Sequence, residues 1–124
     1  MTSYTAASDV SRNETGALIA ATKVKGTAVY DSAGERIGTV DDVMLEKVSG
    51  QVAYAVMSFG GFLGIGEKYH PLPWDRLEYD TDMEGYRVND VGETYRGAPA
   101  YPRDTFYHDD GWRAETERYY RPAL

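Results

Sequence analysis

Residues 51–59, which read QVAYAVMSF, decide the fold. The run is rich in β-branched and aromatic residues and lies between glycines at 50 and 60, so we expect a β-strand. Successive side chains of a strand point to opposite faces, and here both faces are apolar: Val52, Tyr54 and Val56 on one, Ala53, Ala55, Met57 and Phe59 on the other. Both faces should therefore be covered. The inside of a small barrel can cover one, and the C-terminal segment or a second subunit the other.

Shorter strand patterns flank this central segment. The turn at 31–34 includes Gly34, which can take a positive φ, and the adjacent Asp41 and Asp42 suggest a β-bulge that returns Val43 and Leu45 to the inside. Strands at eight-to-twelve-residue spacing with short turns indicate an all-β fold, a small, partly open meander β-barrel. The expected flanking strands are 23–30, 36–48, 68–74 (an edge, because it contains two prolines), 77–79 and 85–88, with one helical turn at 74–77.

The composition narrows the function classes. The chain has 124 residues, no cysteine and a net charge of −7. The absence of cysteine excludes disulfides and Cys-based zinc sites and fits a cytoplasmic location. A nucleic-acid binder normally carries a basic face, so we expect no nucleic-acid partner. The apolar run at 17–21 is too short for a signal peptide or a membrane-spanning helix, so we expect no membrane insertion.

The glycine-rich segment GGFLGIGEKYH at 60–70, followed by Pro73 and Trp74, resembles the PRC-barrel family, as do Ile37 and Gly38 earlier in the chain. The resemblance covers about residues 18–91. It implies a partly open β-barrel and a role in protein assembly, as in the reaction-centre H subunit and the ribosome maturation factor RimM. It carries over no catalytic residue. Without a preceding transmembrane helix or domain, the chain looks like the stand-alone bacterial members.

The chain divides into three parts: a polar lead at 1–16 that we expect to be disordered, the region at 17–91 that resembles the PRC-barrel, and a C-terminal strap with a short helix at 92–124, on which the resemblance is silent. The last part holds seven aromatic residues in 33, many more than a disordered tail carries. We expect 98–102 to be extended and 110–120 to form a helix that Asp109 or Asp110 caps. Trp112, Thr116 and Tyr119 would share its docking face.

The sequence contains no set of residues that predicts a catalytic, nucleotide-binding or metal site. The loop at 60–66 has Walker A glycine spacing, but Glu67 replaces the lysine. His70 stands alone, so we expect it to be a packed residue. We expect His108, Asp109 and Asp110 to mark the start of a helix rather than a metal site. Asp41 and Asp42 should form a bulge rather than an acid–base pair, because adjacent strand residues point to opposite faces.

We therefore expect a non-enzymatic protein-interaction or assembly module, a homodimer or a partner of another protein, without cofactor or metal. A second hypothesis is a small-ligand-binding or regulatory domain with its pocket at the barrel mouth, near Gly60–Lys68. The expected interaction residues are Met57, Phe59, Phe62, Leu63, Ile65, Trp112 and Tyr119.

Overall fold

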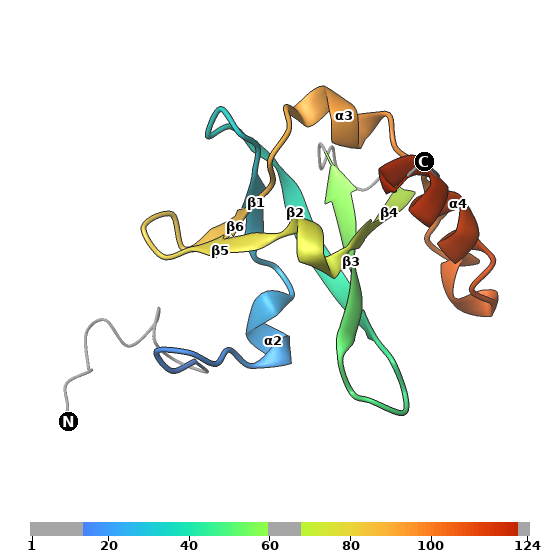
Figure 1. The fold of residues 1–124 in the computed structure, drawn as a ribbon, viewed down its shortest axis with the longest axis horizontal. Helices are drawn as coiled ribbons and strands as arrows, with labels where there is room; N and C mark the ends of the chain where they lie inside the picture. The colour runs from blue at the N-terminus through green and yellow to red at the C-terminus, as the bar shows by residue number, and fades with distance from the viewer. Residues whose placement is uncertain (1–13, 60–67, 122–124) are drawn as a thin grey trace.

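The computed structural model describes residues 14–59 and 68–121. Within them the chain forms one mixed seven-stranded sheet in the order β5-β6-β1-β2-β3-β4-β7, which does not close into a complete barrel (Figure 1). The strands are β1 (Ala28–Tyr30), β2 (Arg36–Leu45), β3 (Val52–Phe59), β4 (Lys68–Pro73), β5 (Glu78–Asp80), β6 (Gly85–Arg87) and β7 (Tyr101–Pro102). The helical segments are α2 (Ala21–Val24), η1 (Trp74–Arg76), α3 (Gly92–Arg96), η2 (Phe106–His108) and α4 (Trp112–Tyr120). The predicted all-β, partly open barrel is confirmed.

The beginning of the barrel differs from the expected strand at 23–30. Residues Ala21–Val24 form the single turn α2, and only Ala28–Tyr30 are extended. Gly26 has a φ of +93°, which interrupts an extended backbone, and Val24 turns its side chain into the core. β1 then pairs antiparallel with β2 and parallel with β6, so the sheet is not a simple meander.

A β-bulge at Asp41 sets the register of the long β2–β3 hairpin. Val40 pairs with Met57 and Asp42 with Val56, which leaves Asp41 as the extra residue that the sequence predicted. Val43 accordingly packs against the barrel core. Leu45 does not: it is 53% exposed, because the hairpin runs on beyond the body of the molecule (Figure 1). Its predicted inward position was wrong.

Gly38 lets β2 and β3 approach closely. A Cβ atom at this position would lie 2.3 Å from the carbonyl oxygen of Ser58 and 2.9 Å from a ring carbon of Phe59. Real side chains do not tolerate such distances, so only glycine fits opposite Phe59.

The core of the barrel lies on the β3 face that carries Ala55 and Met57, both completely buried. Tyr86 of β6 stacks edge-on against both Trp74 and Tyr79, with ring centroids 5.4 and 5.2 Å apart. The other buried members of this core are Val24, Val29, Ile37, Val40, Leu72, Val88, Tyr95, Ala98 and Tyr120.

The opposite face of β3 is covered by the chain's own C-terminal segment. Tyr54 and Val56 form a second buried cluster with Phe106 and Trp112. The Trp112 ring is stacked on Phe106 at 4.8 Å and lies edge-on to Tyr54 at 5.0 Å. Both apolar faces of β3 are thus covered, as the alternation predicted, and a second subunit is not needed for either.

Three details of the C-terminal segment depart from the prediction. Residues Gly92–Arg96 form the helix α3, which was not predicted. Tyr101 and Pro102, within the segment expected to be extended, form the short strand β7 on the edge of β4. The buried face of α4 carries Trp112, Thr116 and Tyr120, whereas Tyr119 is 39% exposed. Neither predicted aspartate caps α4 through its side chain; the carboxylate of Asp109 accepts a hydrogen bond from the Gly111 N–H, one residue before the helix.

Candidate interaction surfaces

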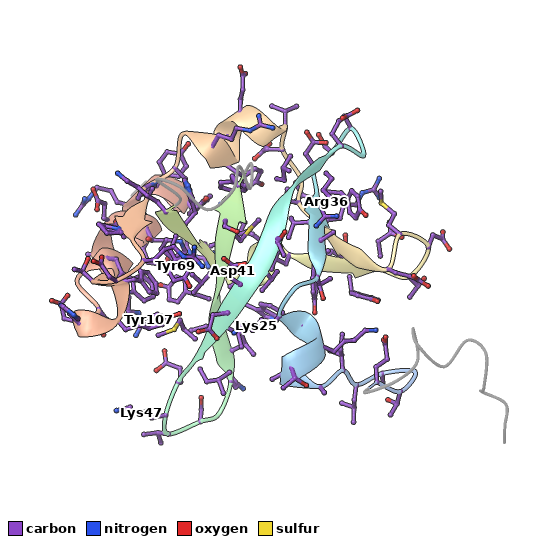
Figure 2. The ribbon with its side chains drawn as sticks, turned by 180° about the vertical axis from the view of Figure 1, so that it is seen from behind. Lys25, Arg36, Asp41, Lys47, Tyr69 and Tyr107 are labelled. Atoms are coloured by element: carbon purple, nitrogen blue, oxygen red, sulfur yellow. The ribbon has the colours of Figure 1, made fainter. Side chains whose placement is uncertain are left out.

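Tyrosine–carboxylate hydrogen bonds fasten the C-terminal segment to the sheet. The Tyr107 hydroxyl donates to Asp42 Oδ2 at 2.7 Å, which joins η2 to the bulge in β2. Tyr54 donates to Glu117 of α4, and burial together with this bond raises the pKa of its hydroxyl. Asp42 therefore has a structural role: its Oδ2 accepts from Tyr107, and its Oδ1 accepts from the Val43 N–H at 2.9 Å. Figure 2 shows Tyr107 beside Tyr69 of β4, and the two rings lie edge-on at 6.1 Å.

Within the C-terminal segment itself, Tyr101 of β7 donates to Glu115 of α4. Burial and this hydrogen bond raise the pKa of Tyr101 to about 12. Arg121, after the end of α4, pairs with Glu117 at 2.7 Å and with Asp75 of η1 at 3.0 Å. These contacts join parts of the C-terminal segment to one another and to the barrel, so the segment is an ordered part of the folded domain.

Asp31 joins the first turn of the barrel to the start of α3. Its Oδ1 accepts hydrogen bonds from the N–H groups of Ala33 and Glu35, and its Oδ2 accepts one from Gly92 at 3.0 Å. The bond from Glu35 lowers the pKa of Asp31 most, burial opposes it, and the bonds from Gly92 and Ala33 lower the pKa further. The sequence gives no sign of this role, because the two ends of the Asp31–Gly92 contact are far apart along the chain.

The β2–β3 hairpin carries the most conspicuous exposed apolar surface of the described residues. Val48 at its tip is fully exposed, and Leu45 is more than half exposed. Figure 1 shows the hairpin projecting away from the sheet, and Figure 2 shows Lys47 at its tip. Beside it lies a groove of about 340 Å³, between the hairpin and the start of α4. The groove is lined by Met44, Leu45, Glu46, Lys47, Val48, Ala53, Tyr54, Asp110, Trp112 and Arg113.

Two charged residues of this groove pair with each other and two do not. Arg113 of α4 binds Glu46 at 3.0 Å and lies over the Tyr54 ring at 5.3 Å from its centroid. Among the residues that the structure describes, Lys47 and Asp110 make no ion pair. We call Leu45, Lys47, Val48 and the groove together the hairpin face.

The structure describes four of the seven expected interaction residues and places them in different surroundings. Tyr119 is exposed on α4, and its hydroxyl donates to the Thr94 carbonyl at 2.6 Å. Met57 is fully buried in the core of its own barrel, and Phe59 packs partly against that core, so Met57 offers no surface to a partner. Trp112 is buried against Tyr54 and Phe106 and only borders the groove. Phe62, Leu63 and Ile65 lie outside the described residues. So does the predicted pocket at the barrel mouth, of which only Lys68 is described. Contact of the remaining expected residues with a partner stays a prediction.

His70 is a packed residue. Its ring lies edge-on to Phe59 at 4.5 Å, and burial, aided by the charge of Lys68, lowers its pKa to about 4. The imidazole is therefore neutral near pH 7. Over residues 14–59 and 68–121, no three His, Asp or Glu side chains come together in a way that could hold a metal ion, and none of the helices has the length and apolarity to cross a bilayer.

Comparison with known proteins agrees with this architecture. The model of the PRC-barrel domain matches residues 17–94, from α2 through the start of α3. The chain belongs to the PRC-barrel family. An uncharacterised protein of Deinococcus radiodurans is 29% identical over 89 residues, which cover 68% of this chain and 32% of that protein. The chain thus spans about a third of the length of this relative. The aromatic clamp on β3, formed by Phe106 and Trp112, lies beyond the PRC-barrel match.

Proposed function

We propose that this PRC-barrel chain is a non-enzymatic protein-interaction module that pairs with a second copy of itself through the hairpin face. The observation that carries the proposal is the exposure of Val48 and Leu45 on a projecting hairpin, next to an open groove. Burying an aliphatic side chain is worth roughly 1.5–3 kcal/mol. Two such exposed side chains near a hairpin tip therefore favour contact with another protein surface that would bury them.

The shape of the hairpin face favours a second copy as that surface. The projecting Val48 and the groove lined by Met44 and Trp112 belong to the same side of the molecule. In a two-fold pair each copy offers the same patch to the other, so the Val48 side chain of each could enter the groove of its partner. Lys47 and Asp110, which make no ion pair with the described residues, also line the groove, Lys47 from the hairpin and Asp110 from the segment just before α4. A reciprocal arrangement would place each beside its opposite charge.

Such an interface is small. Stable interfaces bury about 1,200–2,000 Å² in total, and a hairpin tip with one groove lies at or below the lower end of this range. The pairing should therefore be weak and concentration-dependent. A cytoplasmic location and the absence of catalysis belong to the same proposal; they are supported by the cysteine-free composition and by the structural roles found for Asp42 and His70.

Light scattering coupled to size exclusion, over a wide concentration range, tests the proposal. We expect the apparent mass to rise from 13.8 kDa toward twice that value in the native chain. Val48→Glu should remain monomeric, because a carboxylate cannot enter the apolar groove without loss of its hydration. Val91→Glu is the matched control: Val91 is about as exposed as Leu45 but lies next to α3, away from the hairpin, and this variant should pair normally. A native chain that stays monomeric throughout, or equal loss of pairing in both variants, would contradict the proposal.

A further inference from the structure

A second cavity, separate from the hairpin face, lies where the segment before α2 crosses the β5–β6 hairpin. Its volume is about 370 Å³, within the range of about 300–1,000 Å³ that small-molecule sites occupy. It is lined by the turn at 14–19 and by Tyr79, Thr81 and Tyr86 of the β5–β6 hairpin. We call this cavity the Glu14 pocket.

The turn that forms the outer wall is held by its own hydrogen bonds. Thr15 Oγ1 accepts from the N–H groups of Ala17 and Leu18, at 3.1 and 2.8 Å. A β-bridge joins Glu14 to Ile19, and Ile19 packs on the barrel core. The wall of the pocket is thus formed before any ligand enters.

The chemistry inside the pocket is that of a cation site. The Glu14 side chain is only 14% exposed and lines the cavity, and its Oε2 is buried without a hydrogen-bond partner among the described residues. Lys23 lies 3.6 Å from this oxygen, an ion pair too long for a hydrogen bond, so Oε2 can still accept one from a ligand.

Two aromatic rings complete the site. Tyr79 and Tyr86 meet edge-on at 5.2 Å, both within the lining of the pocket. The π-face of a tyrosine attracts a cation, especially one that carries apolar groups and has lost its water. Burial raises the pKa of both hydroxyls, and the negative charge of Glu14 raises them further, as does that of Glu84 for Tyr79. Both rings therefore stay neutral near pH 7 and lie in a negative field.

We infer that the Glu14 pocket binds a small organic cation, an ammonium ion that carries apolar substituents. The substituents would contact the tyrosine rings, and the positive charge would lie next to the Glu14 carboxylate. Lys23 forms an ion pair with the same carboxylate and therefore opposes a second cation, so binding depends on the contact of the apolar substituents with the rings as well as on the charge of Glu14. This inference does not depend on pairing through the hairpin face.

A titration of the full-length chain with choline, followed by NMR chemical shifts, tests the inference. We expect saturable shifts at the amides of 14–19 and of β5 and β6, with an affinity in the millimolar range for so small a ligand. The neutral isostere with a tert-butyl group in place of trimethylammonium should bind at least about fivefold more weakly. Equal affinity for choline and its isostere, or no saturable shift in this region, would overturn the inference.

Three variants separate the contributions. Glu14→Gln keeps the shape but removes the charge, and should reduce choline affinity by about fivefold or more while leaving the weak binding of the isostere unchanged. Tyr79→Leu should also weaken choline, whereas Tyr79→Phe, which keeps the ring, should bind within about twofold of the native chain. Circular dichroism identifies any variant that fails to fold. Should Tyr79→Leu do so, the comparison of native with Glu14→Gln decides alone: unchanged choline affinity in Glu14→Gln refutes a cation site.

Discussion

Replacement of Trp112 by alanine tests whether the C-terminal segment is part of the folded domain. Trp112 is the central ring of the second cluster: it stacks on Phe106, lies edge-on to Tyr54, and has only 7% of its surface exposed. Truncation of a buried aromatic residue to alanine costs about 3–5 kcal/mol. The aromatic pairs with Phe106 and Tyr54 place the expected loss in the upper part of this range. Since a domain of this size has a free energy of unfolding of about 5–15 kcal/mol, the loss should be large.

Urea denaturation followed by circular dichroism measures this loss directly. Trp112→Phe is the matched control, because it keeps a ring against Phe106, and it should lose less than half as much as Trp112→Ala. Hydrogen exchange of the α4 amides should show protection in the native chain, since a helix of nine residues is unstable in water without docking. A loss below about 0.5 kcal/mol in Trp112→Ala, the usual size of a surface effect, would refute the account of a docked segment.

Three further perturbations test single contacts. Gly38→Ala should lower the free energy of unfolding by more than about 2 kcal/mol in a thermal or urea melt, because its Cβ would overlap a backbone oxygen, whereas Gly16→Ala, with open space around it, should melt like the native chain. Tyr107→Phe should cost about 1 kcal/mol through loss of the hydrogen bond to Asp42, and an equal cost in the background of Asp42→Ala would show that the bond contributes nothing. The pKa of Asp31 is lowered in the folded chain, so its carboxylate stabilises the fold above pH 3.8, its ordinary pKa, and this contribution is lost as the pH falls through the folded pKa. Asp31→Asn should therefore be less stable than the native chain at neutral pH. Its melting temperature should also fall less steeply than that of the native chain as the pH is lowered.

The sequence was informative where the pattern was long. The two apolar faces of 51–59 predicted a strand covered on both sides, and the structure provides both covers from one chain. The paired aspartates predicted the bulge in β2 because an alternating pattern cannot continue through them without one. The helix at 112–120 was visible from its aromatic spacing, although Tyr120, not Tyr119, completes the buried face.

The sequence was silent where contacts between distant segments decide the structure. The single turns α2 and α3 have too few residues for a periodic pattern, and they are held by the burial of Val24 and by the hydrogen bond from Gly92 to Asp31. Likewise, no pattern near Glu14 indicates that this segment folds against Tyr79 and Tyr86. The parallel pairing of β1 with β6 was equally hidden, because strand propensity does not specify a partner.

Complementation between two charge variants tests the proposed pairing most directly. Lys47→Glu should repel Asp110 of a second copy, and Asp110→Lys should repel Lys47, so each variant alone should pair more weakly than the native chain. A mixture of the two should form a heterodimer about as well as the native chain pairs, because opposite charges meet at both reciprocal contacts, in the native sense at one and in the reversed sense at the other, and the apolar contact of Val48 is kept at both. Sedimentation velocity of the separate and mixed variants, with one of them labelled, measures this. Recovery of pairing in the mixture alone is the result that the account predicts. Variants that pair as the native chain does, or a mixture that pairs no better than its components, would contradict it.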